Sequence, residues 1–147
     1  MLLIGLKNPN LQTIDVDGVV NLGSVYRRYT KKGSCGLPTF FSDSNSITLN
    51  HKGIYHVTVV ATVSAPATGD VTLQLLENDT PIVGALATET ITTATTEFHT
   101  LTIDYYILVD SSFVLNSPST IAKTIAIQNT GVEATISNIV VNIDKVL

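Results

Sequence analysis

The sequence predicts an all-β fold, an antiparallel β-sandwich or barrel of about ten strands. Thr, Val and Ile, whose branched side chains suit a pleated sheet, number 21, 16 and 14 among the 147 residues. Apolar and polar residues alternate with a period of two along several segments, most clearly over residues 53–63 and 98–109. Gly, Asn, Asp and Pro separate the segments at short spacing, and no helical period is sustained anywhere.

Ten segments are expected to form strands in chain order. An apolar run at residues 2–6 precedes them, and a short aromatic run lies at residues 37–41. The expected strands are residues 11–16, 19–29, 47–49, 53–63, 70–76, 82–92, 98–109, 113–115, 121–127 and 136–147. The longest alternation, at 53–63, predicts the central strand, because its odd-numbered face from Tyr55 to Val63 is wholly apolar.

The length predicts one domain, residues 1–147. Within it we expect residues 1–36 to supply N-terminal strands and a docking region, and residues 37–147 to form the core of the sandwich. Only 14% of the residues are charged, against about 25% in an average protein. We therefore expect copies of the chain or a partner to cover part of its surface.

Cysteine content and hydropathy indicate where in the cell the protein is expected. Cys35 is the only cysteine, which excludes an internal disulfide and a thiolate metal cluster. The apolar start is too short for a signal peptide, and no run reaches the roughly 18 apolar residues of a membrane helix. We expect a soluble protein that is made in the cytoplasm, without a signal peptide and without membrane contact.

Three stretches carry a resemblance to a known family. Ile47-Thr48-Leu49 followed by Gly53-Ile54-Tyr55 resembles the I-x-L … G-x-Y pattern of C1q/tumour-necrosis-factor-like jelly rolls. Residues 71–78, VTLQLLEN, look like that family's next strand and its turn. Residues 108–114, LVDSSFV, lie where the family has L-x-x-G-D-x-V, but the Gly-Asp pair is absent here, and the last strand lacks the family's small-residue motif.

This resemblance implies a ten-stranded jelly roll that works as a tight homotrimer, with side chains of the inner sheet lining the three-fold axis. The residues add an independent reason, because two strong strands carry apolar side chains on both faces, while a lone sandwich needs only one. The expected interface residues are Tyr55, Tyr105, Tyr106, Ile54, Val60 and Leu108.

No catalytic, cofactor or metal site is predicted. His56 and His99 lie on two strands that could be neighbours, but Glu97 is the only carboxylate at suitable spacing, so we expect polar surface or interface histidines rather than metal ligands. Cys35 follows Lys31 and Lys32, which favours a thiolate, yet no nearby base supports a catalytic role.

Positive charge is concentrated in one short stretch. Arg27, Arg28, Lys31 and Lys32 are half of the eight cations and are interleaved with tyrosines. The stretch is either a docking patch for an acidic protein surface or a charged edge strand that resists aggregation. Nucleic acid is a weaker alternative, because the sequence pI is about 5.1.

The function that we expect is structural. The whole chain, including residues 4–9 and 25–29, resembles small proteins of bacteriophage genomes. This resemblance implies a non-enzymatic virion protein made in the host cytoplasm, a trimeric capsid decoration or head-fibre component whose partners are itself and a capsid or other virion protein. The alternatives are a trimeric receptor- or glycan-binding tip of a phage fibre and a bacterial C1q-like surface domain.

Overall fold

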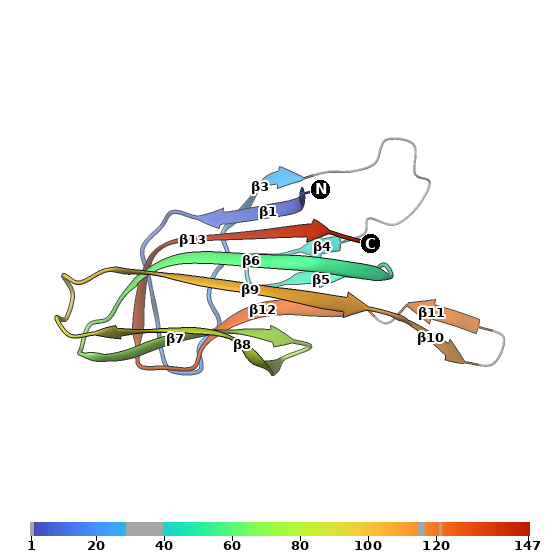
Figure 1. Ribbon diagram of the computed structural model, residues 1–147. Helices are drawn as coiled ribbons and strands as arrows, with labels where there is room; N and C mark the ends of the chain where they lie inside the picture. The colour runs from blue at the N-terminus through green and yellow to red at the C-terminus, as the bar shows by residue number, and fades with distance from the viewer. Residues whose placement is uncertain (1, 29–39, 115–116, 121) are drawn as a thin grey trace.

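The computed structural model describes residues 2–28, 40–114, 117–120 and 122–147, and this part of the chain is built from strands (Figure 1). In these ranges no helix is long and apolar enough to cross a membrane. The strands are β1 (Leu2–Asn8), β2 (Gln12–Ile14), β3 (Ser24–Arg28), β4 (Phe40–Ser42), β5 (Ile47–Leu49), β6 (Gly53–Ser64), β7 (Gly69–Glu77), β8 (Thr80–Ile91), β9 (His99–Val109), β10 (Ser111–Val114), β11 (Ser117–Thr120), β12 (Lys123–Asn129) and β13 (Ala134–Lys145).

Two antiparallel sheets form the sandwich. Sheet A has the order β3-β1-β13-β6-β9, and the short strand β2 also pairs with β13. Sheet B has the order β4-β5-β12-β7-β8. Along the chain the sheet changes between β3 and β4, β5 and β6, β6 and β7, β8 and β9, β9 and β12, and β12 and β13, which is the winding of a jelly roll. The predicted fold class, an antiparallel jelly roll of about ten strands, is confirmed.

The β10–β11 hairpin stands apart from both sheets. It follows β9, and Figure 1 shows it projecting beyond one end of the sandwich. The β7–β8 turn lies toward the same end of the molecule, whereas the β8–β9 loop closes the opposite end. The sandwich therefore has two distinct ends, and the hairpin marks one of them.

The core fills the space between the sheets with alternate residues of each strand. On β6 the residues Val57, Val59 and Val63 are buried, and on β7 the alternation buries Val71 and Leu73. Burying one such aliphatic side chain contributes about 1.5–3 kcal/mol, so the long alternating strands supply most of the driving force for folding. β6, expected as the central strand, is an interior strand next to the edge strand β9, and β13 is the middle strand of sheet A; both carry a row of buried side chains.

Tyr55 completes this row at the end of β6 near the hairpin. Its side chain is fully buried, and its hydroxyl donates a hydrogen bond to the His51 carbonyl oxygen at 2.8 Å. Burial raises the pKa of the Tyr55 phenol, because the charged form would lose its water. Tyr55 is therefore a core residue.

The N-terminal region is part of the sandwich and does not form a separate layer. β1 lies between β3 and β13 inside sheet A, and its residues Ile4 and Leu6 are buried in the core. Farther on, Val20 is also buried, and its amide donates to the Ile127 carbonyl at 2.8 Å. The strands β1, β2 and β3 within residues 1–36 thus all belong to sheet A, and the docking role of this region stays a prediction.

Candidate interaction surface on sheet A

The outward face of sheet A presents an unusual mixture of apolar and polar side chains. Cross-strand pairing of β6 with β9 places Ile54 opposite Leu108, His56 opposite Tyr106 and Val60 opposite Thr102. Pairing of β6 with β13 places Val60 opposite Val140 and His56 opposite Asp144. We call this surface the outer face of sheet A and define it by Ile54, His56, Thr58, Val60, Thr102, Asp104, Tyr106, Leu108, Val140, Asn142 and Asp144.

Three apolar side chains of this face remain open to solvent. Tyr106 is 59% exposed, Leu108 53% and Val60 40%. They are not part of the chain's own core, because the core contains the side chains on the opposite face of β6 and β9. An apolar patch that its own fold leaves uncovered is typical of an interaction surface.

The outward face of sheet B differs in chemistry. Its interior strands carry threonines that hydrogen-bond across the strands, Thr48 with Thr124 at 3.2 Å and Thr72 of β7 with Thr88 of β8 at 2.8 Å. Large apolar side chains that are exposed on this sheet, within the described residues, lie on its edge strand β8. The centre of sheet B therefore presents hydrogen-bonded hydroxyls to solvent, and covering it with a partner would bury little apolar surface.

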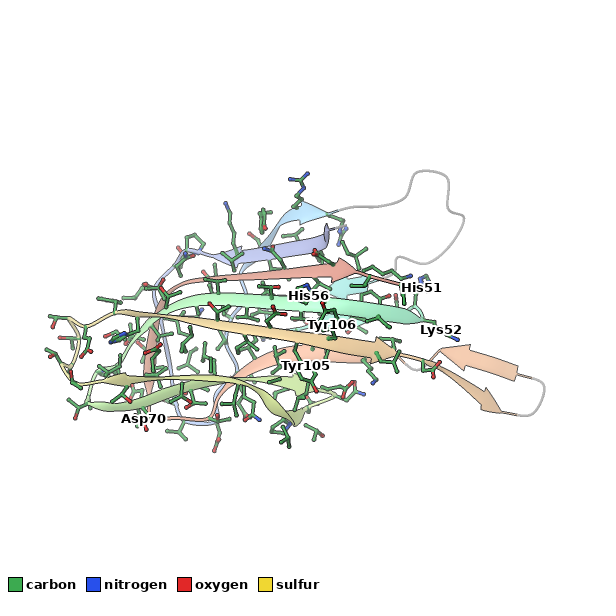
Figure 2. All side chains as sticks on the ribbon, viewed as in Figure 1. His51, Lys52, His56, Asp70, Tyr105 and Tyr106 are labelled. Carbon is green, nitrogen blue, oxygen red and sulfur yellow. The ribbon has the colours of Figure 1, made fainter. Side chains whose placement is uncertain are left out.

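A cluster of His56, Tyr106 and Asp104 occupies the part of the outer face between β6 and β9 (Figure 2). The imidazole stacks on the phenol ring, with centroids 4.7 Å apart and planes inclined by 16°. The imidazole Nε2 is also hydrogen-bonded to a carboxylate oxygen of Asp104. The two side chains on β9 therefore hold the imidazole against the sheet.

Tyr26 extends the surface toward the other edge of the sheet. Its ring lies over Gly5, where an added Cβ would come within 2.6 Å of two ring atoms. Its hydroxyl donates to Asn142 Oδ1 at 2.5 Å, and the Lys7 ammonium lies 5.7 Å from the ring centroid. Glycine at position 5 thus lets an aromatic side chain on β3 lie flat across β1 and reach β13.

The six expected interface residues divide between the two faces of sheet A. Ile54, Val60, Tyr106 and Leu108 share the outer face. The expectation for Tyr55 is wrong, because its side chain is fully enclosed by its own chain. Tyr105 is half-buried and packs against the core, so Tyr106, its neighbour in sequence, is the tyrosine on β9 that faces outward (Figure 2).

The expected docking residues are described only in part. Arg27 and Arg28 are exposed on β3, at one edge of sheet A, and Arg27 pairs with Gly5 of β1. Lys31 and Lys32, like Cys35, lie outside the described residues. The two arginines therefore lie at the margin of the sheet that carries the apolar surface.

His56 and His99 are too far apart to share a metal ion. On β9, His56 is opposite Tyr106, whereas His99 is opposite Val63. The seven residue steps from 99 to 106 span about 23 Å of strand. Among the described residues, no three His, Cys, Asp or Glu side chains are grouped as metal ligands.

His99 instead belongs to a network at the β8–β9 loop. Its Nε2 lies 2.7 Å from Glu97 Oε1, and its Nδ1 lies 3.6 Å from Glu89. The other oxygen of Glu97 accepts hydrogen bonds from the Thr92 amide and hydroxyl and from the Thr93 amide. The hydrogen bond with His99, followed by those from Thr93 and Thr92, lowers the pKa of Glu97 to about 2.

Sequence reasoning missed Asp104, Asn142, Asp144 and Tyr26 as parts of the surface. Asp104 could have been found, because it shares the parity of Tyr106 and Leu108 along one strand. Asn142 and Asp144 join them only through the β13–β6 pairing, and Tyr26 only through the β1–β3 pairing. Such long-range pairings leave no local pattern.

Comparison with known proteins identifies the architecture. No protein-family model and no curated protein matches the sequence. The structure is similar to that of Eiger TNF from S. frugiperda, at 10% identity over 99% of this chain and 93% of that one, with a TM-score of 0.66. The fold is that of a TNF-like jelly roll.

Carbohydrate-binding modules align less well. A family 35 module from Cellvibrio japonicus Abf62 is 15% identical over 96% of this chain and 95% of its own, with a TM-score of 0.43. Another family 35 module, from an environmental isolate, aligns at 15% identity over 96% of both chains, with a TM-score of 0.41.

Proposed function

We propose that this protein is a non-enzymatic structural domain that assembles as a homotrimer through the outer face of sheet A. The observation that carries the proposal is the exposure of Val60, Tyr106 and Leu108 on two adjacent strands whose inner faces are already buried. Removing such apolar surface from water is favourable by about 25 cal/mol per Å².

Sequence composition and fold both support self-assembly. The chain has few charges, and the ionisable side chains His56 and Asp104 of this face are in contact with each other. A large interface that is obligate for the protein is more apolar than the rest of the surface and commonly buries more than about 2,000 Å². The resemblance to the C1q/tumour-necrosis-factor family implies the same symmetry, a trimer.

The test is the mass in solution of the wild type and two charge variants. Light scattering coupled to size exclusion should give about three times the chain mass of 15.7 kDa at micromolar concentration. Val60→Glu should give the single-chain mass, because its carboxylate would be buried without a partner, at a cost of several kcal/mol. Thr72→Glu places the same charge on β7, an interior strand of sheet B, and should leave the trimer intact.

Two results would contradict this proposal. One is a wild-type mass near 15.7 kDa even at high concentration. The other is an equal loss of assembly in both variants, which would mean that added charge, and not the outer face of sheet A, determines the result. Circular dichroism of each variant would show that its strands are retained.

The place of such a trimer in a virus particle stays a prediction from the sequence. Its support is the resemblance to phage proteins, together with a three-fold symmetry that suits the three-fold positions of a capsid. Mass spectrometry of purified particles tests it directly. Absence of the chain from particles whose genome encodes it would leave the trimer proposal untouched and reject the virion role.

A further inference from the structure

The outer face of sheet A carries a titratable group beside two carboxylates. His56 meets Asp104 through Nε2, and Asp144 of β13 is its direct cross-strand neighbour on the other side. The imidazole side chain is 25% exposed, while that of Asp104 is 61% exposed. This group thus lies inside the surface that the proposed trimer would bury.

The positive groups of neighbouring strands lie far from this cluster. Lys7 of β1 is aligned across the strands with Val140 of β13 and Val60 of β6. Arg27 of β3 is aligned in the same way with Gly5 of β1 and Asn142 of β13. By strand spacing, both backbone positions are about 16 Å from that of His56. The Lys7 ammonium interacts with the Tyr26 ring instead, 5.7 Å from its centroid.

The remaining ionisable neighbours do not neutralise the carboxylates either. Tyr106 stacks on the imidazole, Tyr26 bonds to Asn142, and Lys145 places its ammonium 5.8 Å from the centroid of the Tyr55 ring. Locally, Asp104 and Asp144 carry two negative charges when the imidazole is neutral. Protonation of His56 leaves a net single negative charge and turns one contact into an ion pair.

This difference in local charge affects the free energy of association. A carboxylate that leaves water without a partner costs far more than one that is paired and hydrogen-bonded. A symmetric trimer buries the cluster three times and brings its like charges closer together, so each uncompensated charge also repels its copies. Subunits with a protonated imidazole therefore meet a smaller penalty on association.

We propose that assembly through the outer face of sheet A is linked to protonation of His56, so that acidification strengthens the trimer. This inference rests on the proposed function. The trimer binds more protons than three free chains, so its association constant rises as the pH falls. The range to measure is the one in which histidine side chains generally change charge, about pH 5 to 8.

The experiment measures the concentration of half-assembly by sedimentation at pH 5.5, 6.5 and 8.0, at one ionic strength. For the wild type we expect this concentration to be at least about tenfold lower at pH 5.5 than at pH 8.0, from the uptake of about half a proton per subunit. A wild type that assembles equally at all three values would reject the inference and leave the proposed function standing. A wild type that assembles at none would reject the proposed function itself.

Variants assign the proton to its site. His56→Gln can still donate to Asp104 but takes up no proton, so it should assemble as weakly at pH 5.5 as at pH 8.0. Asp104→Asn removes one carboxylate and should assemble more tightly than the wild type at pH 8.0. His99→Gln, which changes the histidine between Glu89 and Glu97 at the other end of β9, should keep the full pH dependence of the wild type.

The variants also separate this site from other acid effects. If His56→Gln keeps the wild-type response, or if His99→Gln abolishes it, another group carries the linkage and the inference is wrong. The same result follows if Asp104→Asn assembles no more tightly than the wild type at pH 8.0. Thermal unfolding of each variant at pH 8.0 checks that the sandwich is intact.

Discussion

Single residues in this fold are governed by the space around their backbone. Gly23 and Gly84 both have a positive φ, 76° and 88°, which costs a residue with a Cβ about 1–2 kcal/mol. Their surroundings differ. An added Cβ at Gly23 would lie 2.2 Å from the Lys7 carbonyl oxygen, whereas at Gly84 it would meet nothing within 4 Å.

We therefore expect Gly23→Ala to lower the free energy of unfolding by about 3–4 kcal/mol, because strain in φ is added to a clash with backbone atoms that have no flexible end to move. Gly84→Ala, the matched control, should cost about 1 kcal/mol. Urea denaturation of both variants measures the difference. Equal losses of unfolding free energy in the two variants would mean that the backbone around Gly23 shifts easily to accept a Cβ, which would contradict the prediction.

At the scale of strands, the sequence predicted periodicity well and orientation less well. The two strongest alternations are β6 and β9, as expected, and they pair with each other along eleven residues. Adjacent tyrosines on β9 necessarily face opposite ways, but alternation alone does not tell which face is inward when both are apolar. Packing decides it: Tyr105 contacts the core and Tyr106 does not.

The pairing of distant strands was beyond the reach of local patterns. β1 and β13 lie at opposite ends of the chain, yet Leu6 pairs with Val141. The Gly or Asn of a hairpin turn predicts that the two strands beside it pair with each other. No local residue pattern predicts the pairing of two strands that are far apart in the sequence. The sequence therefore does not indicate that β1 lies next to β13, nor that Asn142 and Asp144 belong to the outer face of sheet A.

The loop between β8 and β9 supplies a prediction at the scale of an element. Glu97 ties Thr92 and Thr93 to His99, and its pKa is lowered from 4.5 to about 2. A carboxyl whose pKa is lower in the folded state contributes stability above its unfolded pKa and loses it as the pH falls through the folded value. The wild type should therefore lose this contribution between about pH 4.5 and pH 2.

Glu97→Gln should melt at a lower temperature than the wild type at pH 7, and the two curves should converge as the pH approaches 2. Thermal unfolding at pH 7, 4 and 2 measures this. A difference that is constant across the series would mean that the hydrogen bonds of the loop act without the charge of the carboxylate.

The whole molecule combines a weakly charged sandwich with one cationic stretch. The formal net charge is −4, and without Arg27, Arg28, Lys31 and Lys32 it would be −8. The two arginines are exposed on β3, at the edge of sheet A. A trimer would repeat this stretch three times, which multiplies its attraction for an acidic partner.

If the cationic stretch docks on an acidic surface of a virus particle, as the sequence predicts, changing Arg27, Arg28, Lys31 and Lys32 together to Ser should weaken attachment to that particle while the mass of the assembly stays the same. The wild-type attachment should itself weaken as salt rises, because exposed charges are screened beyond about 8 Å at physiological ionic strength. Changing Lys7, Lys52, Lys123 and Lys145 together to Ser alters the net charge by the same amount and is the control, with its mass checked first. Binding to purified particles at several salt concentrations provides the measurement. If both quadruple variants lose attachment equally, net charge alone governs it; if neither does, the arginines on β3 only protect the edge of the sheet from pairing with other strands.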